Sequence, residues 1–326
     1  MQIPPGLEEY THIFFSPHLD DVAFSCGGAI ALERRQGGHV LVVSAFTGEA
    51  DPALPVDAAL APFLAMHQRQ KEDETAMERL HADHLWLGYQ EAIQRHRRYT
   101  SMVGLTSRVL DSDRPLAEAL WGDLVRICQS APRASLYFPL AVANHVDHQI
   151  LFNLGSRLEA IGERVRYYED VPYTFVRGLL QIRLKAINAS IHANPAPRDL
   201  HGHSILRDIL RTHHDLLRMQ IIHAHITRGQ KALLLFYLLY RVLSDVHVRA
   251  RWQRPPPGRR FCPQLVDITE HVPAKLSATG AYGSQVRVLF GDLESFRRAL
   301  EGYSAAVLGQ EGRYVERYWH PLGRTP

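Results

Sequence analysis

The chain contains little cysteine. Its 326 residues include only three, Cys26, Cys128 and Cys262, which lie far apart in apolar surroundings. Small disulfide-dependent secreted domains are dense in cysteine, usually in even numbers, so this pattern excludes a disulfide framework. We therefore expect reduced thiols in the core of a protein from a reducing compartment, which predicts a cytoplasmic location.

Long hydrophobic runs are also missing. The most apolar stretch, residues 232–240, is bounded by Lys231 and Arg241. It is far shorter than the roughly 20 apolar residues that a transmembrane helix needs. Residues 1–10 include two prolines and two glutamates and lack the apolar segment of a signal peptide. We therefore expect neither a transmembrane segment nor export by the usual route.

Charge of one sign is not concentrated anywhere. There are 37 Lys and Arg residues against 34 Asp and Glu residues, a net charge of +3, without a basic stretch interleaved with aromatic residues. This balance argues against a nucleic-acid partner. With 46% hydrophobic and 22% charged residues, the composition is that of an ordinary globular protein with a substantial core.

The residues that are present alternate between strand-like and helix-like patterns. Apolar runs that predict buried strands alternate with segments whose apolar residues recur at helical spacing. This order favours an α/β fold with a Rossmann-like, doubly wound and mostly parallel sheet, whose ligand crevice lies at the carboxyl ends of the strands. The predicted strands are 12–16, 39–46, 84–87, 134–140 and 165–170, and the predicted helices are 21–35, 62–80, 116–129 and 147–160.

Residues 175–262 interrupt this alternation. They are rich in histidine and arginine, include the apolar stretch Leu233 to Leu243, and end in the proline-rich Arg254 to Gly258. We expect a mainly helical insertion between two parts of one catalytic domain, 1–174 and 263–326. Because the apolar stretch has hydrophobic residues almost all round, it must be buried, and a homo-oligomer formed through it is one outcome. After the insertion we expect a strand at 265–272, helices at 274–285 and 293–303, and a tail at 312–319.

Two polar motifs follow predicted strands. The first is Ser16-Pro17-His18-Leu19-Asp20-Asp21, and the second is Asn144-His145-Val146-Asp147-His148. A mixture of imidazole and carboxylate suits zinc, and a catalytic zinc site has three protein ligands and one open position. His18 with an aspartate of the first motif would form half of such a site. His148 is the candidate third ligand, with His145 near it and Asp147 able to orient His145.

Simpler interpretations exist for each motif alone. A single histidine is more often a surface residue than a ligand, and an Asp-Asp pair before a helix is commonly an N-cap followed by a first-turn acid. These interpretations do not explain why both polar clusters directly follow apolar strands at the predicted ligand edge. We therefore favour a metal site.

The two motifs resemble those of a known family. His18 to Asp21 followed by Gly27-Gly28, with His145 to His148 downstream, is similar to the zinc-dependent de-N-acetylases of the N-acetylglucosaminyl-phosphatidylinositol deacetylase type, also called LmbE-like. The resemblance covers about 1–174 and 263–320. Further matching elements occur in order: Thr47-Gly48-Glu49, Arg69-x-x-Glu72, Tyr168-x-Asp170-x-Pro172-Tyr173 and Tyr282-Gly283-Ser284-Gln285.

The resemblance implies specific roles. His18, Asp21 and His148 match the zinc ligands, and Asp20 matches the general base. His145 matches the histidine that stabilises or protonates the transition state, with Asp147 as its orienting partner. Two positions depart from the family's His-Pro-Asp-Asp-Glu pattern, since Leu19 replaces the proline and Val22 the glutamate. Neither is a ligand or the base, but a polar contact near the pocket is lost, which puts the substrate in doubt.

The resemblance implies a zinc-dependent hydrolase that removes an acetyl or acyl group from a small-molecule amino sugar or sugar conjugate. Glu49 and Arg69 are candidate substrate contacts, although such residues are more often solvated. The alternative is a metal-dependent hydratase or lyase that uses the same site on an unsaturated acid. A degenerate sugar-binding module is a third interpretation, and the complete set of ligands and base argues against it.

Overall fold

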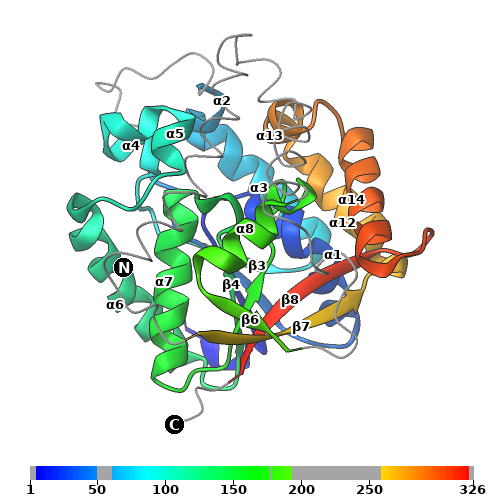
Figure 1. Cartoon of the computed structure of the whole chain (residues 1–326), viewed down its shortest axis with the longest axis horizontal. Helices are drawn as coiled ribbons and strands as arrows, with labels where there is room; N and C mark the ends of the chain where they lie inside the picture. The colour runs from blue at the N-terminus through cyan, green and yellow to red at the C-terminus, as the bar shows by residue number, and fades with distance from the viewer. Residues whose placement is uncertain (1–4, 50–60, 177, 193–257, 323–326) are drawn as a thin grey trace.

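The computed structural model describes residues 5–49, 61–176, 178–192 and 258–322. Figure 1 shows this part of the chain in colour. Eight of its strands form one sheet in the order β3-β2-β1-β4-β5-β8-β7-β6. The strands are β1 (His12–Ser16), β2 (Val40–Ser44), β3 (Asp83–Trp86), β4 (Ser135–Pro139), β5 (Val165–Tyr168), β6 (Ala189–Ile191), β7 (Arg259–Asp267) and β8 (Val315–Leu322).

The sheet has a parallel part and a mixed part. Strands β3, β2, β1, β4 and β5 pair in parallel, so their carboxyl ends share one edge. Strand β8 is antiparallel to both of its neighbours, β5 and β7, whereas β6 and β7 are parallel. The mostly parallel α/β sheet predicted from the sequence is therefore confirmed.

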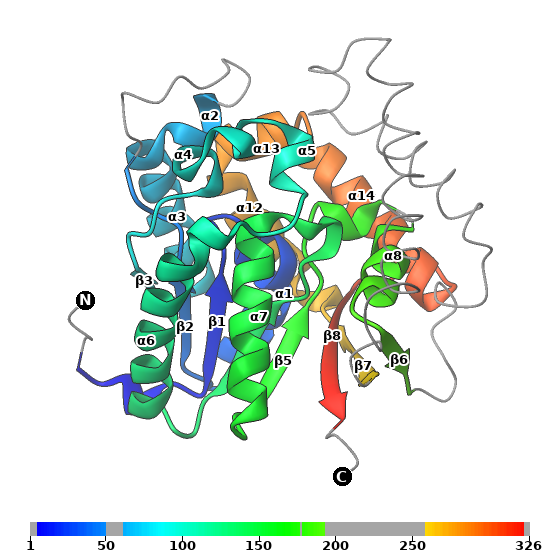
Figure 2. The same cartoon turned by 60° about the vertical axis from the view of Figure 1, so that its left-hand side comes forward.

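Helices cover both faces of the sheet (Figure 2). Helices α6 and α7 lie on one face, and α1, α3, α12 and α14 lie on the other. The helices are α1 (Asp21–Arg35), α2 (Ala61–Leu64), α3 (Met66–Leu80), α4 (Ala92–Arg95), α5 (Met102–Leu105), α6 (Arg114–Ser130), α7 (Val146–Ala160), α8 (Leu179–Ala186), α12 (Val272–Ala281), α13 (Gly283–Leu289) and α14 (Leu293–Leu308).

Two hydrophobic cores result from this arrangement. Side chains alternate along a strand, so Ile13 and Phe15 of β1 pack into the core beneath α6 and α7, whereas Phe14 packs into the core beneath α1 and α12. Both faces of a central parallel strand are buried in this way, which explains why the strands read as continuous apolar runs.

Four predicted elements differ from those observed. The helix expected at 62–80 is divided at Ala65 into α2 and α3, and the one expected at 274–285 is divided at Tyr282 into α12 and α13. The expected tail at 312–319 is strand β8, and β7 begins at Arg259 rather than at 265. Apolar periodicity reports the buried face of a segment, but it does not reveal a one-residue break or a distant strand partner.

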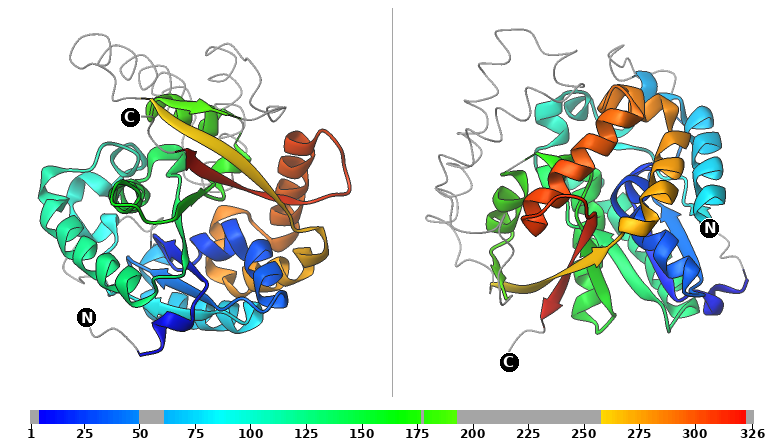
Figure 3. Two further views of the ribbon diagram at one scale, coloured as in Figure 1. Left: turned by 90° about the horizontal axis from the view of Figure 1, so that it is seen from below. Right: turned by 90° about the vertical axis from the view of Figure 1, so that its right-hand side faces the viewer.

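The described ends of the predicted insertion belong to the sheet. Strand β6 and the beginning of β7 pair with each other, and β7 and β8 form a long antiparallel ribbon (Figure 3). Residues 193–257 lie outside the described residues, and so do the Leu233 to Leu243 stretch and the oligomer predicted through it. None of the described helices has the length and apolar character required to cross a membrane.

Candidate metal centre

The first motif forms the turn between β1 and α1. Strand β1 ends at Ser16, and α1 begins at Asp21. The Ser16 hydroxyl donates to the carbonyl of His18 and accepts the N–H of Val22, while Asp21 Oδ2 accepts the N–H of His18 at 2.9 Å. These local bonds fix the imidazole of His18 and the carboxylate of Asp21 on the same side of the turn.

The second motif begins α7 after a strained connection from β4. Ala141, Ala143 and Asn144 have φ values of 60°, 68° and 60°, in the left-handed region that residues with a Cβ rarely adopt. Strained backbone persists only where surrounding contacts hold it in place, and it is concentrated at functional sites. Here the side chain of Asn144 accepts a hydrogen bond from Arg183 at 2.9 Å, and His145 follows directly as the N-cap of α7.

Three predicted ligands converge at the carboxyl edge of the sheet. Asp21 Oδ2 lies 3.0 Å from His18 Nδ1 and 3.4 Å from His148 Nε2, and the three ligand atoms all lie within 4.8 Å of one another. Tetrahedral zinc with ligand bonds of about 2.0–2.1 Å would separate its ligand atoms by about 3.3 Å. These three side chains therefore fit a small divalent cation.

The outer nitrogen of each histidine faces a carboxylate. His18 Nε2 lies 3.1 Å from Asp147 Oδ2, and His148 Nδ1 lies 2.5 Å from Asp170 Oδ1. A histidine that donates its outer N–H to a carboxylate turns an unprotonated nitrogen toward the metal, which is the usual arrangement around metal ligands. Although burial opposes it, nearby carboxylates, Glu91 and Asp147 foremost, raise the pKa of His18 well above its usual value, so the site favours a positive charge.

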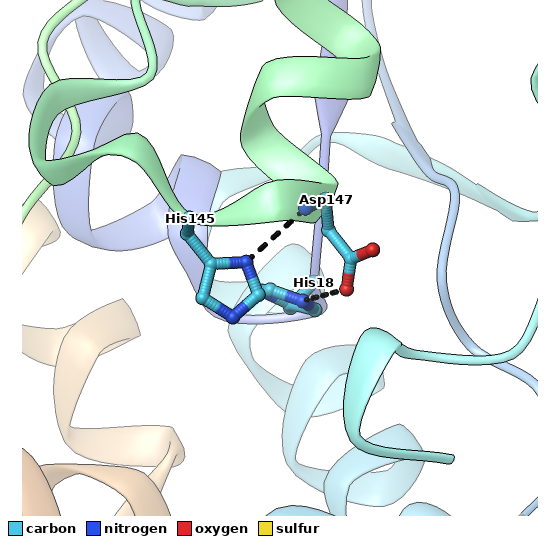
Figure 4. A group of neighbouring side chains, drawn as sticks. All are labelled: His18, His145 and Asp147. Carbon is cyan, nitrogen blue, oxygen red and sulfur yellow. Dashed lines mark hydrogen bonds and ion pairs between the residues drawn. The ribbon is translucent and has the colours of Figure 1, made fainter. Parts of the chain in front are cut away.

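A second group of possible ligands shares His18. His18, His145 and Asp147 also offer ligand atoms within 4.8 Å of one another. Figure 4 shows His145 and Asp147 on the first turn of α7 beside His18. The carboxylate of Asp147 already accepts the N–H of Ala92 at 2.9 Å and lies 2.7 Å from Arg95 Nη1. We favour the group with Asp21 and His148, because both of its histidines have a carboxylate behind them.

Asp147 does not orient His145 as predicted. Its carboxylate contacts His18, and only its backbone N–H contacts His145, donating to Nδ1 at 3.3 Å (Figure 4). The reason is geometric: as N-cap, His145 turns Nδ1 toward the unpaired N–H groups of the first helical turn. Burial and the neighbouring His18 lower the pKa of His145 well below its usual value. The neutral ring therefore carries its proton on Nε2.

Asp20, the predicted base, lies beside the ligand group. Its side chain is buried, and Oδ1 is 3.2 Å from Arg69 Nη2. Burial raises the pKa of Asp20, while Arg69 opposes that rise. Arg69 also pairs with Glu91 and is only 2% exposed, so it supports Asp20 from behind and is not solvated. Glu49 is exposed at the end of the loop after β2, next to residues outside the described part of the chain.

Three residues of the site were given no role in the sequence analysis. Asp170 lies two residues after the end of β5, so its position at the carboxyl edge of the sheet could have indicated a role in the site. Arg95, which contacts Asp147, lies in a segment without clear apolar periodicity. Tyr282 donates to the carbonyl of Leu19 at 2.9 Å across 263 residues of sequence, and no local pattern could indicate that contact.

A comparison with known protein families finds a match for the part of the chain that carries this site. Residues 13–158 match the model of PIG-L, the GlcNAc-PI de-N-acetylase family. This part of the chain, 146 of its 326 residues, is similar to the PIG-L family. The matched region contains both motifs and all of the predicted ligands, whereas Asp170 lies beyond it.

Two curated relatives share one name. The chain is 31% identical over 176 residues to 2'-N-acetylparomamine deacetylase of Streptomyces fradiae, covering 52% of this chain and 60% of the relative. It is 26% identical over 184 residues to the protein of that name from Niallia circulans, covering 49% of this chain and 66% of the relative. The match therefore spans less than two thirds of either relative.

Solved structures support the same fold. The zinc-inhibited form of a teicoplanin deacetylase matches with a TM-score of 0.63 at 19% identity, covering 97% of this chain and 100% of that chain. An antimicrobial pseudoaglycone deacetylase matches with a TM-score of 0.60 at 19% identity, covering 96% and 98%. At this level of identity, the likeness concerns the fold alone.

Proposed function

We propose that this protein is a zinc-dependent N-deacetylase that removes an acetyl or acyl group from an amino sugar or sugar conjugate. The observation that carries the proposal is the convergence of His18 Nδ1, Asp21 Oδ2 and His148 Nε2, together with Asp20, whose carboxylate interacts electrostatically with His18 and Asp21. Three ligands and an adjacent carboxylate are what metal-assisted hydrolysis of an amide requires.

The relatives support the substrate class. Both curated relatives bear the name 2'-N-acetylparomamine deacetylase, which denotes removal of an N-acetyl group. An N-acetylated amino sugar is therefore the first substrate class to test. Because both relatives are named for cleavage of an amide, hydration of an unsaturated acid is the less supported alternative.

His18, Asp21 and His148 would hold a zinc ion, which would supply polarisation of the amide carbonyl and activation of a water molecule. Asp20 then takes the proton of the attacking water. A general base works best when its pKa lies near the working pH, and burial of Asp20 raises its pKa in that direction. The ion pair of Arg69 with Asp20 fixes the direction of the carboxylate during this transfer.

His145 has a separate role. Its Nδ1 accepts the N–H of Asp147, so its Nε2–H can donate a hydrogen bond to the oxyanion that develops on the former carbonyl. His145 therefore acts as a neutral donor. If the Asp147 carboxylate were its partner, as predicted from the sequence, the His145 imidazole would instead be protonated. The proton on the leaving amine then comes from Asp20, which received it from the water.

We also propose a reducing, cytoplasmic location. It is supported by the three cysteines, of which Cys26 and Cys128 are buried and all are free.

The test combines products with metal content. Purified protein loaded with zinc should release acetate and the free amine from at least one member of a panel of N-acetylated amino sugars, measured by mass spectrometry. Asp20→Asn should keep its zinc and lose about 10² to 10⁴ in kcat. Asp21→Asn and His148→Ala should lose zinc as well.

The exposed Asp111→Asn is the matched control and should leave zinc content and rate unchanged. Full zinc occupancy in both ligand variants would contradict the ligand assignment. Zinc binding without acetate release from any N-acetylated sugar would contradict the substrate class.

A further inference from the structure

Arg95 connects the candidate metal centre to a segment without an assigned role. It is the last residue of α4, its side chain is 7% exposed, and its guanidinium lies between two carboxylates. Nε is 3.0 Å from Asp113 Oδ1, and Nη1 is 2.7 Å from Asp147 Oδ1. Asp113 is held in turn by the hydroxyl of Tyr99. This buried clamp belongs to 91–113, which follows β3.

The Asp147 carboxylate contacts the first and the last residue of α4. Its Oδ1 faces Arg95, and its Oδ2 accepts the N–H of Ala92, the first residue of α4, at 2.9 Å. The same Oδ2 lies 3.1 Å from His18 Nε2. A continuous path of polar contacts therefore runs from Arg95 through a fully buried carboxylate to a candidate metal ligand.

We propose that Arg95 is a positioning residue for the metal centre: it holds the Asp147 carboxylate against His18 Nε2 and so keeps His18 Nδ1 directed at the metal. This inference rests on the proposed function, since it assumes that His18 is a ligand. Carboxylates behind metal-binding histidines set the tautomer and the ring orientation, and their loss weakens metal binding. Here Arg95 acts one step further out, on the carboxylate.

An arginine suits this position better than a lysine. The planar guanidinium can face Asp113 through Nε and Asp147 through Nη1 at the same time, which a single ammonium on a flexible stem does poorly. The guanidinium carbon of Arg95 also lies over the ring of Phe46, 5.0 Å from the ring centre. Without this cation, Asp147 Oδ1 would be buried without its ion-pair partner, and the carboxylate could turn away from His18.

The experiment measures zinc affinity rather than turnover. Wild type, Arg95→Gln and Arg95→Lys are stripped of metal, and the zinc dissociation constant of each is obtained by competition with a chromophoric chelator. Arg95→Gln should bind zinc about 10-fold to 100-fold more weakly. Arg95→Lys, which restores the charge but not the fork, should recover part of the loss. The visible spectrum of the cobalt-substituted protein should change in Arg95→Gln, since the orientation of a ligand changes.

Arg157→Gln is the matched control. Arg157 also pairs with a carboxylate, Glu118, but both side chains are largely exposed on the surface of α6 and α7. The zinc affinity and cobalt spectrum of the Arg157→Gln variant should equal those of the wild type. Thermal unfolding of every metal-free variant separates loss of fold from loss of ligand positioning.

The outcomes distinguish this inference from the proposed function. A folded Arg95→Gln protein with wild-type zinc affinity and cobalt spectrum overturns the role of Arg95 alone. A wild-type protein that binds no zinc overturns the proposed function and this inference with it. If Arg95→Gln does not fold, Asp113→Asn, which keeps the charge of Arg95 but removes one side of its clamp, should weaken zinc binding by a smaller factor; unchanged affinity there overturns the inference.

Discussion

Asp73 is an ionisable residue buried behind the first motif. It is fully buried, it accepts the indole N–H of Trp86 at 2.6 Å, and its other oxygen lies 2.6 Å from the hydroxyl of Tyr282. That hydroxyl also lies 2.9 Å from the carbonyl of Leu19, between His18 and Asp20. Burial is the main cause that raises the pKa of Asp73 to about 7. A protonated Asp73 would donate to Tyr282, leaving the Tyr282 proton for Leu19.

This pKa predicts a pH dependence of stability. The folded pKa lies above the unfolded value, so the folded state binds more protons between about pH 4 and pH 7, and Asp73 destabilises the fold increasingly as pH rises through this window. The slope is at most about 1.4 kcal/mol per pH unit. Asp73→Asn imitates the protonated acid, so its advantage over wild type should grow from pH 4 to 7 and then level off.

Urea unfolding of metal-free protein at several pH values measures this difference. Asp111→Asn, at an exposed position, should give a curve parallel to that of the wild type. If Asp73→Asn also ran parallel to the wild type, Asp73 would not titrate in this range.

Helix α1 begins at the acidic residues of the site, and side chains from β8 and α12 bind backbone groups in the middle of this helix. The carboxylate of Glu316 in β8 accepts the N–H groups of Gly28 and Ala29 at 2.9 Å each. Lys275 of α12 pairs with Glu316 at 2.7 Å and donates to the carbonyl of Phe24 at 2.6 Å. The close approach of these elements requires Gly28, because a Cβ there would lie 2.7–2.9 Å from atoms of Ile268.

Gly28→Ala should therefore destabilise the fold. The nearest atoms include the branched Cβ of Ile268, which cannot move without its backbone, so we expect a loss of about 1–3 kcal/mol in the free energy of unfolding. Gly122→Ala in α6 is the matched control: a Cβ there meets nothing within 4 Å. It should be neutral or stabilise by up to about 1 kcal/mol because alanine favours a helix. Equal effects of the two variants in urea unfolding would contradict this packing argument.

At the scale of the whole molecule, the candidate metal centre joins three strand ends. His18 and Asp21 follow β1, His148 follows β4, and Asp170, which holds His148, follows β5. A cation bound there would link α1 to α7 across the two faces of the sheet. Metal binding should therefore be coupled to the stability of the entire fold.

Removal of the metal tests that coupling. At a free zinc concentration 100 times the dissociation constant, binding to the folded state alone adds about 2.7 kcal/mol. The melting temperature should rise with zinc and fall with a chelator, as measured by scanning calorimetry. His148→Ala should lose this response, whereas the exposed His84→Ala should keep it. An equal shift in both variants would mean that zinc acts elsewhere.

The sequence by itself determined the features that depend on neighbouring residues. The apolar run of β1, the polar turn at His18 to Asp21 and the helix that starts at Asp21 follow one another directly, so pattern and position together predict them. The same holds for β4 and the His145 to His148 turn. Parallel pairing then brings both turns to one edge, which is why the fold class and the approach of His18, Asp21 and His148 could be predicted.

Only the tertiary structure decided which side chain meets which. Asp147 reaches His18 rather than His145, Arg95 comes from a segment about 50 residues earlier in the chain, and β8 enters the sheet antiparallel between β5 and β7. Each depends on the relative placement of elements distant in sequence. Local propensity and periodicity specify the face that a segment buries, but the partner across the interface is set by packing of the whole chain.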